Sequence, residues 1–590
     1  MTIAQPGQSA GARSRWIIGK SEVVAHDGMV ATMYPQATDA GLAMLEAGGN
    51  AVDAAVAAAF AVGVVEPFNS GLGGIAQLVY FEASTGRSYV VDGIPTLPVG
   101  LRPALFQVVE GGGTAGVYGW PMVKGDANNT GFLAPAVPGV PACLCTALER
   151  FGCLSRPRVM APAIELAERG YLLDWYVALA MACGQERLQR FPESRRTFFK
   201  PGGACYRAPM LGMAADRFVQ PDLAESLRLV AREGADVFYR GVIGRRIAQH
   251  LTANGGVLSE AEIAAFEAPV LEPGLRGSYR GYDLIQAPHH TGAPTALQAL
   301  NILEGYNLAA LGHNRVEALH LVVEALRLAF LDRFGHLGDP AQQPVPHNGL
   351  VSKGYAAQLR AGIDPARAHI DAAAGNPWAF EAADAEQTAL RGPSAAANPD
   401  RAGAGQTTHI TVVDRERNMV ALTATLGSHF GSAVVVPSTG ITLNNAAMWF
   451  DPTPGSVNSI GPGKRIIWAG TPTLLLQEGK PFFAVGAPGG RKIISAVVQS
   501  ILNVVDYGLG AQDAVAAPRV HCEGRETLVD AALGSDTADG LRRLGHQVTV
   551  VEETFSTSHF ARPNGVLVDR ASGTLRGGVN QYKPATAAGL

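Results

Sequence analysis

The sequence predicts a layered protein of helices and β-sheets, of either the α/β or the α+β class. Two observations support this prediction. Apolar, β-branched runs lie on both sides of a low-complexity segment, residues 366–406, and a mostly helical region lies between about residues 140 and 365. Such elements stack in layers around an apolar core. Hydrophobic residues make up 47% of the chain and charged ones 17%, which is enough apolar material for a large core.

The first hundred residues alternate between helix and strand signals. A short helix that starts at Thr38 and Asp39 is expected to stop at the Gly48-Gly49 pair. Asn50 is expected to cap the next helix, with Asp53 in its first turn. This pattern places two consecutive helices before the first long strand.

Apolar runs of strand length occur before and after the low-complexity segment. They are bounded by Gly, Pro and polar residues, as strands are. The predicted strands cover residues 75–81, which follow the SGLGG turn, and residues 407–414, 419–426, 432–437, 471–477 and 481–488, and a helix is expected from about residue 492 to 506.

Composition excludes some classes of function. The net charge is −4 and the isoelectric point is near 6.4, which argues against a nucleic-acid partner, because such a partner needs a basic face. The longest apolar stretch, residues 51–65, is too short to cross a bilayer. The first twenty residues lack the apolar core of a secretory signal. We therefore expect a cytoplasmic protein without a membrane partner.

The stretch GQTTHITVVD, residues 405–414, begins a β-branched run directly after the low-complexity segment. One interpretation is an ordinary strand start, since Thr and Val favour strands. The other is that the chain is cut before Thr407, which becomes a new N-terminus. A threonine hydroxyl needs a base to act as a nucleophile, and an α-amino group with a pKa of about 8 on the same residue can supply it. The same hydroxyl can attack the Gln406 carbonyl and make the cut itself.

Such a reaction also needs donors for the negatively charged oxygen of its intermediate. The turn GAPGG, residues 486–490, follows an apolar strand and precedes the predicted helix. Backbone N–H groups at a glycine pair beside a helix N-terminus suit an anion. Many strand–helix turns look like this, so the turn alone is weak evidence. The glycine-rich loops 71–74 and 461–465 lack the spacing of nucleotide-binding motifs.

Taken together, ordered motifs between about residues 22 and 525 resemble the γ-glutamyltranspeptidase family of N-terminal-nucleophile hydrolases. The resemblance implies an α+β fold of four αββα layers, a single proenzyme domain and self-cleavage before Thr407. The products would be a large subunit, residues 1–406 ending in a flexible linker, and a small subunit, residues 407–590. These would stay associated as a heterodimer, and pairing of two heterodimers is left open. The motifs are GGNAVDAAVAAAFAVGVVEP, SGLGG, VPGVPA, YRGYDL, LQALNILEG, EALRLAFLDRFGHLGDP, QTTHITVVD, TLNN, NSIGPGKR, and GAPGG with NVVDYGL.

The resemblance assigns catalytic roles by position. Thr407 matches the nucleophile, and Thr425 matches a second threonine whose hydroxyl supports it. Gly489 and Gly490 match the glycines of the oxyanion hole. His409 matches a histidine near the nucleophile. For this residue, a packing role in the strand is at least as good an interpretation as a catalytic one.

The substrate-binding positions depart from the family. Glutamyl-specific members hold the substrate's α-carboxylate with an arginine and its α-amino group with a Gln and an Asp, and they carry an asparagine and a serine pair nearby. Each replacement here deletes a polar or charged group, so a zwitterionic head group would lie unpaired in a desolvated pocket, which is costly. The matching positions are, in the same order, Ile94, Ala446 and Trp449, Gly427, and Trp468-Ala469.

Three hypotheses follow. The favoured one is a self-processing amidohydrolase whose acyl group is not γ-glutamyl, with Trp449 and Trp468 shaping a pocket for an aromatic or small uncharged acyl group. Oxamate-type amidohydrolases and cephalosporin-type acylases are models for this change. The alternative is a glutathione hydrolase or γ-glutamyltransferase in which Arg491 and Lys492 supply positive charge to the substrate. The third is a non-catalytic binding or structural protein, which the intact QTTH and glycine-pair motifs disfavour.

No cofactor and no metal are expected. The pair His289-His290, and His320 with Glu324, are isolated in the sequence, and the chemistry needs no ion. The expected partner is a small-molecule amide, with either water or an amine as the acceptor of the acyl group.

Overall fold

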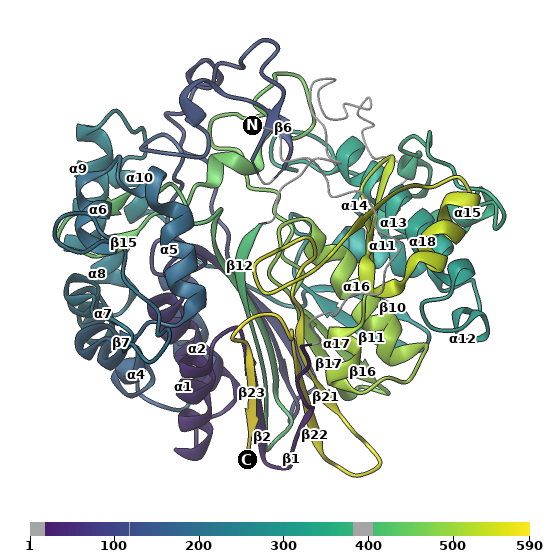
Figure 1. Ribbon diagram of the computed structural model, residues 1–590, viewed down its shortest axis with the longest axis horizontal. Coiled ribbons are helices and arrows are strands. Elements are labelled where there is room, and N and C mark those ends of the chain that lie inside the picture. Colours follow the sequence, from purple (N-terminus) through teal and green to yellow (C-terminus); the bar gives the residue numbers. More distant parts are fainter. Residues whose placement is uncertain (1–17, 117, 382–404) are drawn as a thin grey trace.

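The computed structural model describes residues 18–116, 118–381 and 405–590. Within these ranges, two seven-stranded sheets lie face to face at the centre of the molecule, and helices cover their outer faces (Figure 1). Neighbouring strands are antiparallel throughout both sheets. The α+β fold of four αββα layers is therefore confirmed.

The first sheet carries the segment around Thr407, and the second carries the strand that leads into the GAPGG turn. The first sheet has the order β23 (Thr586–Gly589), β2 (Gly28–Thr32), β12 (Gln406–Asp414), β13 (Met419–Gly427), β3 (Ile75–Glu82), β4 (Arg87–Gly93) and β9 (Val270–Leu271). The second has the order β1 (Val23–Ala25), β22 (Leu575–Val579), β21 (Asn564–Val568), β17 (Lys480–Gly486), β16 (Thr473–Gln477), β11 (Tyr282–Gln286) and β10 (Leu275–Tyr279).

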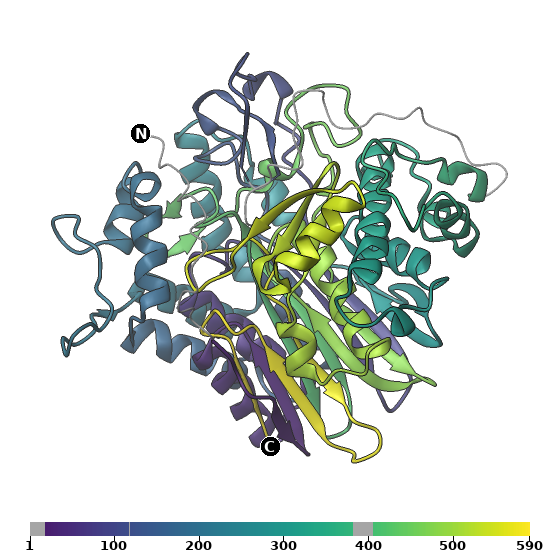
Figure 2. The ribbon, with the colours of Figure 1, turned by 45° about the vertical axis from the view of Figure 1, so that its right-hand side comes forward.

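Helices from different parts of the chain cover the two sheets (Figures 1 and 2). On the first sheet lie α1 (Pro35–Glu46), α2 (Ala51–Val65) and α3 (Val140–Phe151). On the second lie α11 (Ala293–Leu303), α16 (Lys492–Val505) and α17 (Ala511–Ala516), with α13 (Val316–His336) packed on α11. An apolar core between the sheets is built from Met29, Phe81, Ile285, Leu474 and Val566 with their neighbours.

The two N-terminal helices show one prediction confirmed and one corrected. Asn50 caps α2, and its side chain and that of Asp53 form the reciprocal hydrogen bonds of a capping box. Helix α1 begins at Pro35 and not at Thr38, because proline suits the first helical turn and the Thr38 hydroxyl bonds to Thr32 instead. The predicted helix near residue 492 is confirmed as α16, whereas the predicted strand 432–437 shortens to β14 (Val435–Val436).

The packed structure extends into the first part of the predicted linker. Residues 366–381 are described and partly packed: Trp378 is buried in a short 3-10 helix, Pro377–Phe380, and the Gly375 amide donates to Asp332 in α13. An apolar tryptophan and a buried carboxylate thus hold the first part of the predicted linker on the protein. The rest of it, residues 382–404, lies outside the described residues.

None of the helices in the described part of the chain combines the length and the apolar character needed to cross a membrane.

Candidate active site

The bond predicted to be cut lies at the first residue of β12. Gln406 pairs with Gly427 at the end of β13, and the register shifts between Gln406 and Thr408, so the ladder is irregular at Thr407. Thr407 is buried, with 4% of its surface exposed. Irregular pairing frees a strand residue from the flat ladder and re-aims its side chain, as bulges near active sites do. The residue predicted as the nucleophile is therefore the one at which the strand geometry breaks.

Thr425 contacts the carbonyl of the bond, not the nucleophile's hydroxyl. Its Oγ1 donates a 2.6 Å hydrogen bond to the carbonyl oxygen of Gln406 and accepts a 2.8 Å bond from the Gly427 amide. The second bond orients the hydroxyl so that its proton points at the carbonyl. A donor in this place stabilises negative charge that develops on that oxygen when the carbonyl is attacked.

The glycine pair of the GAPGG turn lies directly against the segment that precedes the bond. A Cβ atom on Gly405 would come within 2.3 Å of the backbone N of Gly490, so the two backbones touch. Gly489 and Gly490 both have positive φ, at 148° and 62°, which favours glycine at both positions. In the uncut chain Gly405 thus covers this turn.

Two sequence motifs serve as the scaffold behind these groups. In the SGLGG turn, a Cβ on Gly74 would lie 2.6 Å from the Thr425 carbonyl oxygen, so this glycine permits close backbone packing. In the TLNN motif, Asn444 donates to the Gly73 carbonyl, and Asn445 accepts from the Ser428 amide. Both motifs position the end of β13.

His409 is a packing residue in this structure. It is fully buried, its Nδ1 bonds to Thr423 Oγ1 at 2.8 Å, and its ring lies against the backbone of Gly486. Burial lowers the pKa of His409 to about 3. A neutral imidazole held between the two sheets does not reach the scissile bond through any of these contacts.

The positions that bind the glutamyl head in the family are apolar here and lie together. Gly427 has a φ of 105°, and a Cβ there would lie 2.1 Å from the Asn445 side chain, so no larger residue fits without rearrangement. Four of the other positions belong to one buried apolar cluster, which also contains Tyr118 and Trp120: Ile94, Ala446, Trp449 and Trp468. Ala469 belongs to the neighbouring cluster under the second sheet.

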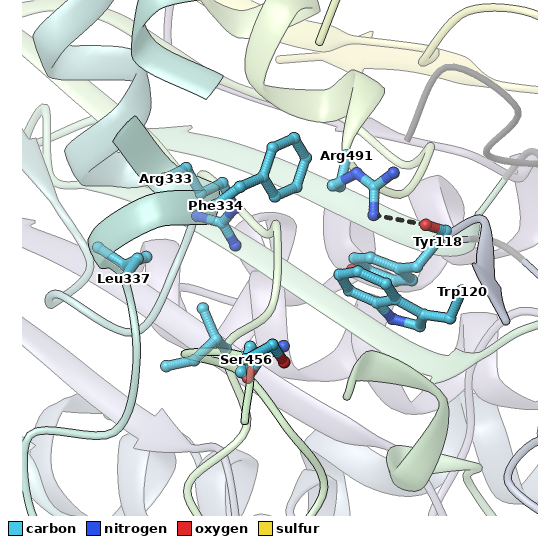
Figure 3. Close-up of a pocket in the computed structure, with 9 residues that line it drawn as sticks. Tyr118, Trp120, Arg333, Phe334, Leu337, Ser456 and Arg491 are labelled. Atoms are coloured by element: carbon cyan, nitrogen blue, oxygen red, sulfur yellow. Dashed lines mark hydrogen bonds between the residues drawn. The ribbon is translucent and has the colours of Figure 1, made fainter. Parts of the chain in front are cut away.

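A narrow cavity adjoins this cluster and the glycine turn (Figure 3). Tyr118 and Trp120 stack on one side with ring centroids 6.2 Å apart, and the Arg491 guanidinium lies over both rings. Arg333 and Phe334 face them from the end of α13. Of the six predicted substrate-binding residues, Arg491 alone is among the described residues that line this cavity. The remaining lining residues are Leu337, Ser456, Asn458 and Ile467.

The two arginines make the cavity positive. Arg491 forms a buried 2.7 Å ion pair with Glu523 and donates to the Tyr118 carbonyl. Burial alone would raise the pKa of Glu523, but Arg491 and His521 hold it below its usual value. The Arg333 guanidinium donates hydrogen bonds to the carbonyls of Thr291 and Trp468. Among the described residues, it forms no ion pair. Its pKa is lowered to about 10 by burial, so the group stays charged at neutral pH.

Sequence reasoning missed most of the cavity lining. Tyr118 and Trp120 lie in a glycine-rich stretch without periodicity, so no pattern marked them. Arg333 did carry a signal, because it stands in α13, a helix whose faces are buried almost all round, where an arginine needs a reason. Asn458 begins the NSIGPGKR motif and Ser456 lies two residues before it, in a loop whose conformation the sequence does not define.

One group of potential metal ligands occurs among the described residues: His320, Glu324 and His546, whose ligand atoms lie within 4.8 Å of one another. The prediction that His320 and Glu324 are isolated is wrong, because His546, far away in the sequence, lies beside them. Hydrogen bonds use these atoms. His320 Nε2 donates to the Asp364 carbonyl, so Nδ1 accepts from His546, and Arg327 pairs with Glu324. This pattern is that of a satisfied buried network.

Comparison with known proteins agrees with the geometry. The chain is 37% identical to the Acylase ACY 1 proenzyme of Pseudomonas sp. (strain SE83) over 88% of this chain and 87% of that protein. It is 32% identical to the glutathione hydrolase proenzyme of Bacillus subtilis (strain 168), over 96% and 92%. The crystal structure of cephalosporin acylase from Bacillus halodurans superimposes with a TM-score of 0.82 at 27% identity, covering 100% of this chain and 99% of that one.

The family model for gamma-glutamyltranspeptidase matches residues 37–589, nearly the whole chain. This match includes the strand that begins at Gln406, the second threonine and the glycine turn. The chain therefore belongs to the gamma-glutamyltranspeptidase family of N-terminal-nucleophile hydrolases.

Proposed function

We propose that this amide hydrolase is made as a proenzyme that cuts its own Gln406–Thr407 bond. The Thr407 hydroxyl attacks the Gln406 carbonyl, Thr425 stabilises the resulting oxyanion, and the C–N bond breaks as the nitrogen takes up the proton. Water then hydrolyses the ester, which releases the Gln406 carboxylate and leaves Thr407 with a free α-amino group and hydroxyl. That amine serves as the base when Thr407 later attacks a substrate amide.

The observation that carries this proposal is the 2.6 Å hydrogen bond from Thr425 to the Gln406 carbonyl, beside a glycine turn packed on Gly405. The proenzyme names of the two relatives agree with it. The test is a denaturing gel: the wild-type protein should give two bands, and Thr407→Ala one band near the full mass of 61.6 kDa. Two bands from Thr407→Ala would mean that another protease cuts the chain, and one band from wild type would favour the non-catalytic interpretation.

We further propose that the acyl group is not γ-glutamyl and ends in one negative charge. The family's head-group positions are apolar here, which supports the first part. Arg491 is paired with Glu523, whereas Arg333 has no ion-pair partner among the described residues and is free to bind an anionic group at the cavity, which supports the second. This proposal replaces the aromatic or small uncharged acyl group expected from Trp449 and Trp468 with a charged one. A ω-carboxyacyl amide such as a glutaryl amide fits this description.

A second candidate, glutathione hydrolysis or γ-glutamyl transfer, is favoured by a specific observation. Asn458 Oδ1 and Ser456 Oγ are buried at the same cavity, and neither has a hydrogen-bond partner within residues 18–116, 118–381 and 405–590. Buried acceptors without donors are unfavourable, and the α-ammonium of a glutamyl head would satisfy them while Arg333 bound its carboxylate. The relative from Bacillus subtilis is a glutathione hydrolase, which is consistent with this option.

Turnover of three p-nitroanilides separates the two candidates. For the favoured one, the glutaryl compound should be hydrolysed much faster than the butyryl compound, which lacks the charge, and at least roughly 10³-fold more efficiently than the γ-glutamyl compound, a ratio equivalent to about 4 kcal/mol. A γ-glutamyl compound that is the best substrate would establish the second candidate. Addition of amine acceptors to the same assay distinguishes hydrolysis from transfer.

A further inference from the structure

Arg562 is a buried cation for which the reaction above has no role. It lies just before β21, and only 1% of its surface is exposed. Its Nη1 donates to the Tyr176 hydroxyl and to Ser558 Oγ, both at 3.2 Å, whereas its Nε has no hydrogen-bond partner in the described part of the chain. Among the described residues, no carboxylate lies within ion-pair distance of it. A guanidinium buried with neutral partners destabilises the fold, so its position needs an explanation.

Arg562 connects the residue before the scissile bond to the glycine turn. Its Nη2 donates to the side-chain oxygen of Gln406 at 3.4 Å, and its backbone amide donates to the Pro488 carbonyl at 2.9 Å. The preceding residue, Ala561, packs closely on the turn: a Cβ atom added to Gly489 would lie 2.5 Å from the Cβ atom of Ala561. A shift of Arg562 would therefore move the Gln406 side chain relative to the turn.

Burial weakens the negative charge that faces Arg562 and Gln406. Two carboxyl groups interact with Arg562, and burial raises the pKa of both, although Arg562 acts in the opposite direction. They are Glu553 and, nearer Thr408 and Asn69, Glu66, whose pKa is raised to about 8. At neutral pH this group is therefore largely uncharged. Gln406 thus lies in a field that favours an acceptor or a negative charge at its side chain and disfavours a positive one.

We propose that Arg562 is a positioning residue for self-cleavage, which holds the Gln406 side chain so that the Gln406 carbonyl stays on the Thr425 hydroxyl beside the glycine turn. The proposal rests on the self-cleavage proposed above. Arg562 contacts neither the carbonyl nor the Thr407 hydroxyl in the structure, so it acts through Gln406. A fixed side chain next to the reacting carbonyl keeps it in a near-attack geometry.

The first test changes the charge at position 406 and leaves Arg562 intact. Full-length chain is made by cell-free translation, so that it starts uncut, and the two bands are followed with time on denaturing gels. Gln406→Glu should be cut at least as fast as wild type, and Gln406→Lys at least about 10-fold more slowly, because it places like charges together in a buried site. Equal rates for the Glu and Lys variants would overturn the proposal. A wild-type chain that is never cut would refute self-cleavage itself, and this proposal with it.

The second test is a double-mutant cycle between Arg562→Met and Gln406→Leu. If the two side chains act through one another, the double variant should be cut no more slowly than the slower single variant, and Arg562→Lys should recover part of the rate. If instead the two single-variant losses in cleavage rate multiply in the double variant, the proposal is contradicted. Arg187→Met is the matched control: Arg187 is also largely buried and donates to the carbonyls of His429 and Gly431, so its effect should multiply with that of Gln406→Leu.

Folding is checked separately in the Thr407→Ala background, which stays uncut, by thermal melting of each variant. If Arg562→Met does not fold there, the charge series at position 406 decides the proposal alone, since those variants keep Arg562.

Discussion

Thr425 Oγ1 lies 2.6 Å from the carbonyl oxygen of Gln406, to which it donates a hydrogen bond. In the uncut chain this threonine is therefore placed to stabilise the oxyanion of the proposed self-cleavage, whereas the sequence predicts that it supports the Thr407 hydroxyl. After cleavage Gln406 can leave, and the same hydroxyl becomes available to groups on the Thr407 side. One residue can thus serve both reactions, with a different partner in each.

This relationship predicts the effect of removing the hydroxyl. Thr425→Val should slow self-cleavage roughly 10²–10³-fold, the usual loss for one oxyanion donor, and Thr425→Ser should retain most of the rate. The rate is measured on chain that starts uncut, and melting of the same variants in the Thr407→Ala background controls for stability. Unchanged cleavage in Thr425→Val would remove this hydroxyl from the mechanism.

The close contact between Gly405 and the glycine turn predicts that position 405 tolerates only glycine. In Gly405→Val the Cβ would meet backbone atoms of Gly490, which cannot give way as a side chain can, so the scissile bond should shift and cleavage should slow at least about 10-fold. Gly19→Ala is a suitable control, since no atom of the residues that the structure describes lies within 4 Å of a Cβ at that position. A Gly405→Val chain that is cut at the wild-type rate would show that this contact does not position the bond.

Buried histidines predict a loss of stability in mild acid. Burial lowers the pKa of His409 to about 3, and the same cause places His429 and His546 at about 3. The unfolded imidazole takes up its proton near pH 6.5, so folding binds fewer protons across this window. The stabilising contribution of each buried histidine is therefore complete above about pH 6.5. As the pH drops toward 3, the free energy of unfolding falls by at most about 1.4 kcal/mol per pH unit for each histidine.

The measurement is urea unfolding of the uncut Thr407→Ala protein between pH 7 and pH 4. His409→Gln should flatten the fall by up to about 1.4 kcal/mol per pH unit, and the exposed His26 provides the matched control substitution. Glu66 opposes the trend, since its pKa is raised by burial, so the difference between variants is the informative quantity. An identical slope in His409→Gln would contradict the burial argument.

The sequence indicated the nucleophile because its chemistry is local: a threonine at a strand start, after a low-complexity segment, needs no partner to be noticed. The glycine turn was visible for the same reason. The cavity could not be predicted, because Arg333, Arg491 and Tyr118 are far apart in the chain and meet only through the packing of α13, α16 and a loop. The contact of Thr425 with the Gln406 carbonyl also depends on strand register, which a one-residue slip would change.

The last prediction concerns the charged end of the acyl group. Arg333→Met removes one cation from the cavity and should lower kcat/KM for the glutaryl p-nitroanilide roughly 10–100-fold, the usual loss for a charge-assisted hydrogen bond. The butyryl compound should change by less than about threefold, since it has no carboxylate to bind, and Arg333 also holds the Trp468 carbonyl in either case. The ratio of the two values does not depend on how much of the enzyme is folded, so partial misfolding of the variant cannot produce the result.

Asn458→Ala should leave the turnover of both substrates nearly unchanged. Replacement of Trp449 or Trp468 should alter the preference between acyl groups while self-cleavage continues. Equal losses on the glutaryl and butyryl compounds would mean that Arg333 only supports the fold, and a selective loss of γ-glutamyl turnover in Asn458→Ala would show that an α-amino acid head is bound here by residues other than those its relatives use.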